Sequence, residues 1–469
     1  MKSLRLLALL SLICCLLLGL AQPAAAFCGF FVSQANTSLF NQASQVIIAR
    51  DHYRTILTMA NDYQGDIENF ALVVPIPVAI SEDQVHVGDP AILRRLDEFS
   101  APRLVEYIDS DPCAVRMGTS FSFGINESQL GSAPVGSAGE LAYPSDQTLG
   151  VTVEQRFNRG EYNILLLSAK ESKGLETWLQ HNGYRLPPDA SSVLRPYIRQ
   201  NFKFFVAKAN LDEFEQQGFQ TLRPLQIAYE SPRFSLPIRL GMLNAQGDQD
   251  LIVYLLTPSG RVELTNYRTV EMTTATVPEF VENEFDAFYQ ALLQTSYDQE
   301  NREVAFLEYA WDMSQCDPCV ADPLTPQELR QAGVFWLSLS PPRPEQPASA
   351  LPPFPERLMT QQAYITRLHL RYSRDRFPED LTFQTTGNRR NFQARYPIWR
   401  PYRGDLNCPA AASYRASVRD RQAREIATTA QLTGWDITEL HHKVAWLNDP
   451  PPPPQPSGDA WWRDLFTTE

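Results

Sequence analysis

The sequence has no excess of basic residues, and after its amino terminus it has no long apolar run. It carries 41 Lys and Arg residues against 54 Asp and Glu residues, a formal net charge of −13. Proteins that bind nucleic acid normally display a strong basic patch, so this balance predicts no nucleic-acid partner. Beyond residue 26, no segment approaches the ~20 apolar residues that cross a bilayer. We therefore expect no transmembrane segment in the mature chain.

The common catalytic signatures are also missing. The sequence contains no G-x-S-x-G elbow, no H-E-x-x-H, no Walker A motif and no G-x-G-x-x-G after a strand. Unrelated enzymes reach the same catalytic geometry without a shared motif, so this absence does not exclude an enzyme. Of only six histidines, His86 is the best candidate for a general base, because it precedes a predicted strand-to-helix junction; a structural role is the alternative. We predict no cofactor and no metal site.

The amino terminus has the three parts of a cleavable signal peptide. Lys2 and Arg5 carry positive charge, residues 6–20 are mostly apolar, and residues 24–26 are three alanines. Small residues at this position are what a signal peptidase reads, and the apolar run is shorter than the ~20 residues of a retained membrane helix. We predict cleavage near Ala26 and a periplasmic or extracellular protein.

Few cysteines remain once this leader is removed. In an oxidising compartment, cysteines form disulfides by default. Five is an odd number, so at least one is free or pairs with another molecule. Spacing does not determine the connectivity; we expect Cys28 to pair with Cys113, because both flank the same N-terminal block, and the other three to share one bond. The cysteines of the mature chain are Cys28, Cys113, Cys316, Cys319 and Cys408.

Cys316 and Cys319 form a C-x-x-C sequence. Thiol exchange at such a pair needs a thiolate stabilised at a helix N-terminus, whereas the next predicted helix begins only near Thr325. A structural disulfide is therefore the favoured interpretation, and thiol-disulfide redox chemistry is the alternative. Zinc would require two further ligands, and no second C-x-x-C or paired histidine lies nearby.

Strand patterns dominate the middle of the chain. The β-branched runs at 46–49 and 53–59 predict a hairpin, and the runs at 251–256 and 261–267 flank a Thr-Pro-Ser-Gly turn that predicts a second hairpin. Residues 367–372 alternate like a half-exposed strand. Strands and helices follow one another irregularly. This favours an α+β, β-rich fold with mostly antiparallel sheets, several packed helices and disulfides.

Helix signals are local and clear. Asp89-Pro90 is a typical helix start, and Thr325 followed by Glu328 is a capping box. Residues 411–432 predict a long helix that ends at Gly434. Its Arg residues alternate with carboxylates such as Glu425, which predicts a solvated face.

Pro-rich stretches suggest the domain boundaries. The expected organisation has five parts, each marked by a change in composition. They are a signal peptide at 1–26, a main α+β body at 27–340, a Pro-rich linker or loop at 341–357, a strand and helix segment at 358–447, and a Pro-rich, Trp-containing tail at 448–469.

Several stretches of the sequence form a recognisable combination: Phe27–Phe30, Met59–Gly65, Ala71–Pro77, Ser100–Tyr107, Asp111–Cys113, Leu167–Ser172, Gly174–Leu179, Leu194–Ile198, Leu236–Met242 and Asn266–Thr269. Together they resemble the exported bacterial proteins of the domain of unknown function 2330 family (DUF2330). The resemblance covers most of the chain from residue 27 to about residue 320 and is specific in combination. It implies a secreted or envelope location, and it implies no activity, cofactor or catalytic residue.

Three functions remain open from the sequence. The preferred hypothesis is a non-enzymatic envelope or periplasmic protein that binds an unknown protein or small molecule. The first alternative is a redox enzyme that uses Cys316 and Cys319. The second is a hydrolase of envelope material with an unrecognised site.

Overall fold

The structure is a computed structural model in which part of the chain is described. The described residues fall into several ranges that are separated by gaps. They are residues 30–33, 40–41, 44–60, 63–64, 70–114, 150–182, 190–210, 213–214, 222–243, 247–315, 323–337 and 363–447.

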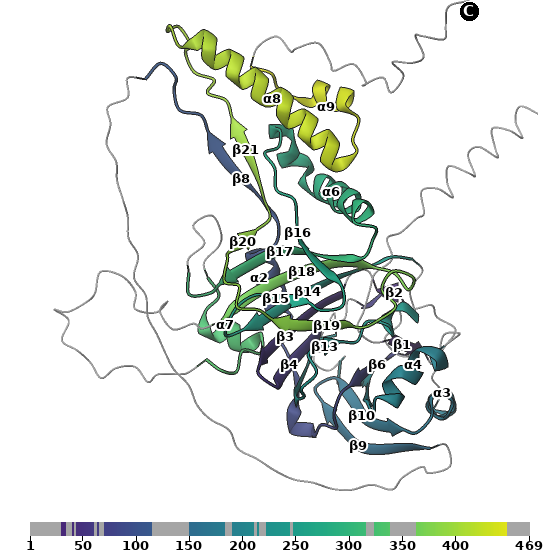
Figure 1. Ribbon diagram of the computed structural model, residues 1–469. Helices are drawn as coiled ribbons and strands as arrows, with labels where there is room; N and C mark the ends of the chain where they lie inside the picture. Colours follow the sequence, from purple (N-terminus) through teal and green to yellow (C-terminus); the bar gives the residue numbers. More distant parts are fainter. Residues whose placement is uncertain are drawn as a thin grey trace, which may run out of the picture.

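A large, mostly antiparallel sheet forms the centre of the molecule (Figure 1). Two of its strand pairs, β16 with β17 and β14 with β3, are parallel. In spatial order the strands are β16 (Arg268–Glu271), β17 (Val304–Asp312), β18 (Tyr364–Tyr372), β14 (Gln249–Thr257), β3 (Ser44–Asp51), β4 (Arg54–Ala60), β12 (Leu225–Glu230) and β7 (Val85–Val87), and β20 (Phe392–Gln393) also pairs with β17.

A second, fully antiparallel sheet packs against one face of the main sheet. Alternate residues of β3 show the arrangement: Val46 and Ile48 join the core between the two sheets, whereas Ile47 and Ala49 face the opposite side. The order of this sheet is β1 (Phe30–Ser33), β6 (Phe70–Ile76), β11 (Lys203–Ala209), β10 (Tyr162–Ala169) and β9 (Val151–Arg159).

Helices cover the two outer faces, which gives four layers. Leu96 and Phe99 of α2 (Ala91–Ser100), with Leu329 of α7 (Pro326–Gln331), pack on the main sheet. The outer face of the second sheet is covered by α3 (Ser172–His181) and α4 (Ala190–Arg199). The expected α+β, mostly antiparallel fold is confirmed.

Helix starts follow the local signals. The Oδ1 of Asp89 accepts a hydrogen bond from the backbone N–H of Ala91 at 2.8 Å, and α2 begins there. Thr325 and Glu328 form the predicted capping box at α7, with the backbone N–H of Glu328 donating to the Thr325 hydroxyl at 3.2 Å.

The smaller elements connect these layers. Three short strands form one small sheet, and further pairs join β2 with β5 and β21 with β8. Their bounds are β13 (Ser235–Leu236), β19 (Leu381–Thr385), β15 (Val262–Leu264), β2 (Phe40–Asn41), β5 (Tyr63–Gln64), β8 (Arg103–Ile108), β21 (Arg395–Arg400), η2 (Glu82–Gln84) and η4 (Gly241–Leu243).

One predicted hairpin is confirmed and the other is wrong. β3 and β4 pair antiparallel around a turn in which His52 has a φ of 49°. The Thr257–Gly260 turn instead ends β14 and leads to β15, which pairs with β19. Both edges of β14 are occupied, by β18 and β3, so the chain after the turn has no open edge there.

The prediction of a half-exposed strand at 367–372 is also wrong. β18 lies between β17 and β14, and its second face is covered as well as its first. Arg367 is 4% exposed and His369 is 9% exposed. The alternation identified the strand, but its polar face is turned toward other charged groups and away from water.

A helical unit lies at one end of the molecule (Figure 1). There β8 and β21, paired in parallel, extend from the main sheet toward α8 (Ala411–Thr433) and α9 (Ile437–Lys443). Helix α8 ends at Gly434, as predicted, and the φ of 72° at this glycine is left-handed. The 3-10 helix η5 (Glu279–Glu284) and α6 (Phe285–Gln299) complete the unit. No helix in the described part of the chain is long and apolar enough to cross a membrane.

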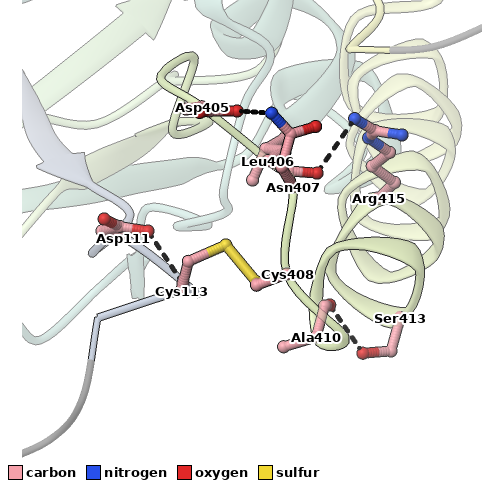
Figure 2. The surroundings of a disulfide bond; sticks show 9 residues. All are labelled: Asp111, Cys113, Asp405, Leu406, Asn407, Cys408, Ala410, Ser413 and Arg415. Carbon is pink, nitrogen blue, oxygen red and sulfur yellow. Dashed lines mark hydrogen bonds between the residues drawn. A yellow bond between two sulfur atoms is a disulfide. The ribbon is translucent and has the colours of Figure 1, made fainter.

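A disulfide lies within this unit, and it corrects the expected pairing. Cys113, just after β8, is bonded to Cys408, just before α8, across 295 residues of sequence (Figure 2). The expected bond between Cys28 and Cys113 is therefore wrong. The reason is the parallel pairing of β8 with β21, which brings the ends of two distant segments together.

Candidate functional site

The residues singled out in the sequence do not meet in one place. His86 lies on the edge strand β7, where it is exposed and opposite Gln226 of β12. Cys316 and Cys319 lie outside the described residues, as does Cys28, so the redox hypothesis stays a prediction. The described residues contain no group of three or more His, Cys, Asp or Glu side chains arranged to hold a metal ion.

The main sheet contains a cluster of buried charges that sequence reasoning missed. Its centre is Glu308, which is fully buried at a β-bulge in β17. The register passes from Leu307 opposite Leu368 to Tyr309 opposite Arg367, so Glu308 is the extra residue of the bulged strand. A bulge of this kind re-aims a side chain.

Two cations of β18 bind the Glu308 carboxylate. Its Oε2 accepts from Nε of Arg367 at 2.6 Å, and its Oε1 lies 2.7 Å from Nδ1 of His369. The hydroxyl of Tyr289, from α6, donates to the same Oε1. A buried charge is tolerated when it is paired and hydrogen-bonded, and Glu308 meets both conditions.

Two further carboxylates lie close to the nitrogens of Arg367 and His369 that do not contact Glu308. Nη1 of Arg367 lies 2.6 Å from Oδ1 of Asp97 on α2. Asp250 of β14 lies 3.7 Å from Nε2 of His369 and binds Arg371 through both its oxygens at 2.8 Å. The network thereby ties three neighbouring strands to the helices above them.

The electrostatics of the cluster favour the charged forms. Burial alone would raise the pKa of Glu308, but the charges of His369 and Arg367 and the hydrogen bonds of His369 and Tyr289 lower it to about 2. Burial alone would lower the pKa of His369, but Glu308 and Asp250 raise it to about 9. His369 is therefore an imidazolium at neutral pH, held between two carboxylates.

This cluster has the properties of a structural clamp. Glu308 is fully buried, and Glu308, Arg367 and His369 line neither of the two hollows described below. The sequence does contain a signal for it: Arg367, His369 and Arg371 alternate along one strand. Three cationic groups on one face of a buried strand require carboxylates from elsewhere, and the sequence does not say which.

The clamp predicts a specific pH dependence of stability. The pKa of His369 is raised from 6.5 to about 9, so its contribution is complete below pH 6.5 and is lost as the pH rises through about 9. We expect the free energy of unfolding to fall by about 3 kcal/mol over that interval. Urea unfolding at a series of pH values measures this loss.

The variant His369→Gln provides the control for this titration. Glutamine does not titrate, so the free energy of unfolding of this variant should not show the decrease above pH 6.5 that His369 causes in the wild type. Parallel pH profiles for the two proteins would contradict the assignment. On the acid side the sign reverses: the pKa of Glu308 is lowered from 4.5, so its contribution is lost as the pH falls from 4.5 toward 2.

The described residues also form a pocket of about 200 Å³ in the helical unit, which we call the C-terminal pocket. Elements η5, β21 and α8, with α9 and the residues after it, contribute its walls. The lining residues are Pro278, Glu279, Phe280, Glu282, Asn283, Trp399, Arg400, Gln422, Glu425, Lys443, Val444 and Ala445.

Glu425 is the most unusual group of the C-terminal pocket. It is 6% exposed, so the predicted solvated face of α8 is wrong at this position. Arg421, one turn earlier, places its Nη atoms 2.8 and 3.0 Å from Asp109, and its Nε is 3.7 Å from the Glu425 carboxylate. Burial raises the pKa of Glu425 to about 7; Arg421 opposes this shift, and Glu279 and Asp109 add to it.

Two buried oxygens of the pocket have no hydrogen-bond partner within the described part of the chain. They are Oε1 of Glu425 and Oε1 of Gln422, which is 5% exposed. The Nε2 of Gln422 already donates to the carbonyl of Ala445 at 3.2 Å. Buried polar atoms are normally satisfied, and an ordered water or a bound molecule can supply the missing donors.

The cations at the pocket already have partners. Arg400 binds Glu106 at 3.1 Å and Glu282 at 2.6 Å. Lys443 binds Glu284 at 2.7 Å. Because these cations are paired, the atoms of the pocket that remain able to form a new hydrogen bond include Oε1 of Glu425 and Oε1 of Gln422.

The ionisable groups of the lining are carboxylates, Arg400 and Lys443. None of the described lining residues is Ser, Thr, Cys or His. Glu425, with a pKa near neutrality, can take up or release a proton. The arrangement is suited to recognising a hydrogen-bond donor and to coupling that recognition to a proton.

A second hollow, of about 280 Å³, lies beside β4 and β12. Its walls include Ile56, Tyr229 and Phe335, and its charged pair, Arg54 with Glu230 at 2.8 Å, is satisfied and exposed. None of its described lining residues has a buried polar atom without a partner. It therefore gives no comparable indication of a ligand.

Comparison with known proteins finds one match. Residues 22–384 match the model of a family described as "Uncharacterized protein conserved in bacteria (DUF2330)", which confirms the resemblance seen in the sequence. No curated protein and no solved structure matches the chain. The matched region ends within β19, so Cys408 and Glu425 lie beyond it, whereas η5 lies inside it.

Proposed function

We propose that this chain, which belongs to the bacterial family DUF2330, is an exported protein that binds a ligand or partner outside the cytoplasm. The observation that carries the proposal is the C-terminal pocket, which combines a volume of about 200 Å³ with two buried oxygens that have no hydrogen-bond partner among the described residues. A concave site with a few polar atoms available for bonding is typical of ligand recognition.

Two features support the location. The Cys113–Cys408 bond is of the kind that forms and persists in the periplasm or outside the cell. The sequence in front of Phe27 has the charge, apolar and alanine segments of a signal peptide. Together they favour a chain that folds after it crosses a membrane.

The proposal predicts retention of a ligand at the C-terminal pocket. The chain is expressed with its own amino terminus and isolated without reductant. Its intact mass should correspond to a start at Phe27, with Cys113 linked to Cys408. The purified protein is then equilibrated across a dialysis membrane with a small-molecule extract of the bacterial envelope. We expect mass spectrometry to find at least one component enriched with the protein and chemically unchanged.

Two matched variants locate the binding. Asn283 is exposed at the pocket, so Asn283→Trp should obstruct it without disturbing the core and should abolish the enrichment. Ala287 is exposed on the neighbouring α6 outside the lining, so Ala287→Trp should retain it. Conversion of extract components to products, or equal enrichment by both variants, would contradict the proposal.

A further inference from the structure

We propose that the C-terminal pocket recognises a small primary ammonium group, bound between the carboxylate of Glu425 and the side-chain carbonyl of Gln422. The inference rests on the proposed binding function and names the chemical class of the ligand. It follows from which atoms in the pocket lack partners, from the charges around them and from the size of the space.

The unsatisfied atoms determine what the ligand must supply. An ionised carboxylate only accepts hydrogen bonds, and the free Oε1 of Gln422 is likewise an acceptor, since its Nε2 is already bonded to the carbonyl of Ala445. The ligand must therefore donate to both. An –NH₃⁺ group provides three donors on one atom, and its charge strengthens the bond to a carboxylate.

The charges exclude an anion as the natural ligand. Arg400 and Lys443 line the pocket but are neutralised by Glu282 and Glu284. An anion would have to displace these carboxylates and would be repelled by Glu425. A cation would share Glu425 with Nε of Arg421, which lies 3.7 Å away, but the Nη atoms of Arg421 are engaged by the two oxygens of Asp109.

The walls suit a short alkyl chain behind the ammonium group. Phe280 and Trp399 contribute aromatic surface to the pocket. Both rings already attract cations: Nζ of Lys443 lies 5.5 Å from the centre of Phe280, and Cζ of Arg421 lies 5.8 Å from that of Trp399. The volume of about 200 Å³ is equivalent to roughly seven water molecules, which fits a chain of a few carbons.

Glu425 also makes the binding depend on pH. Burial raises its pKa to about 7, so at pH 6 most molecules hold a proton there that an ammonium ligand must displace. Binding then releases a proton to solvent, and the cation stabilises the carboxylate left behind. The apparent affinity should increase about tenfold from pH 6 to pH 8.

The probe that tests this inference is n-butylammonium chloride, with n-butanol and sodium butyrate as its neutral and anionic counterparts. Titration of the mature protein at pH 8, followed by nuclear magnetic resonance, should show saturable binding of butylammonium alone. At pH 6 the affinity should be about tenfold lower. Equal binding of butanol, or no change with pH, would overturn the inference.

Two variants assign the effect to the buried carboxylate. Glu425→Gln keeps the shape but removes the charge, and it should lower the affinity at pH 8 at least tenfold and abolish the pH dependence. Glu439, exposed on α9, is the matched control, and Glu439→Gln should bind as wild type does. Unchanged binding by Glu425→Gln would overturn the inference.

The experiment separates this inference from the broader proposal. If the pocket retains an envelope component that Asn283→Trp excludes, yet butylammonium does not bind, the ammonium specificity is wrong and the binding function stands. If neither the extract nor the probe yields a ligand, both are wrong.

Discussion

Glu308→Gln is expected to lower the free energy of unfolding by about 3–5 kcal/mol, as the removal of one partner of a buried ion pair typically does. The substitution keeps the size of the side chain but leaves Arg367 and His369 facing a neutral group inside the sheet. Asp97 and Asp250 hold the outer sides of these cations and cannot replace the lost contact. Urea unfolding at pH 6.5, followed by fluorescence, measures the change.

A second measurement shows whether the loss arises from charge. Glu308 is a main cause of the raised pKa of His369, so in Glu308→Gln this pKa should fall from about 9 to near or below 6.5. Nuclear magnetic resonance of the imidazole reports it directly.

An exposed pair on the same sheet is the matched control for Glu308. Glu230 binds Arg54 at 2.8 Å with both side chains about two-thirds exposed, so Glu230→Gln should cost no more than about 1 kcal/mol. A loss of similar size in both variants would contradict the assignment of Glu308 as the centre of a buried clamp.

Loss of the Cys113–Cys408 bond is expected to destabilise the helical unit by about 2–5 kcal/mol. The bond closes a loop of 295 residues and lies where the paired strands β8 and β21 meet the start of α8. Without the bond, the unit retains its strand pair and its contacts with α6. The conformational entropy of the unfolded chain increases, however, and this favours unfolding. Hydrogen exchange of the α8 amides in Cys408→Ser should therefore accelerate more than exchange in β3 or β14.

The double variant Cys113→Ser with Cys408→Ser guards against new pairings of a lone thiol. It should exchange at the same rate as Cys408→Ser, and reduction of wild type should reproduce the effect. If α8 amides exchange as in wild type in all three cases, the bond contributes little and the prediction is wrong.

Local features of the fold were predictable because their causes lie within a few residues. The β3–β4 hairpin follows from two β-branched runs around a short polar turn, and α7 follows from the reciprocal bonds of Thr325 and Glu328. Gly434 ends α8 because a left-handed residue without a Cβ is needed there. Such signals depend on backbone preferences and on neighbours in sequence.

The sites were less predictable because each depends on segments far apart in the chain. Glu308 becomes a buried partner only when β17 lies beside β18 and a bulge re-aims its side chain. Glu425 looked solvated because its own helix is rich in charge, and η5 and β21 bury it.

The sequence by itself determined an α+β, mostly antiparallel class and several element boundaries, since these depend on composition and short-range periodicity, and it predicts a leader typical of export. Only the tertiary structure decided that Cys113 joins Cys408, that β18 is covered on both faces and that a pocket forms around Glu425. The physical reason is that burial and pairing are properties of two surfaces in contact, and a single stretch of sequence specifies only one of them.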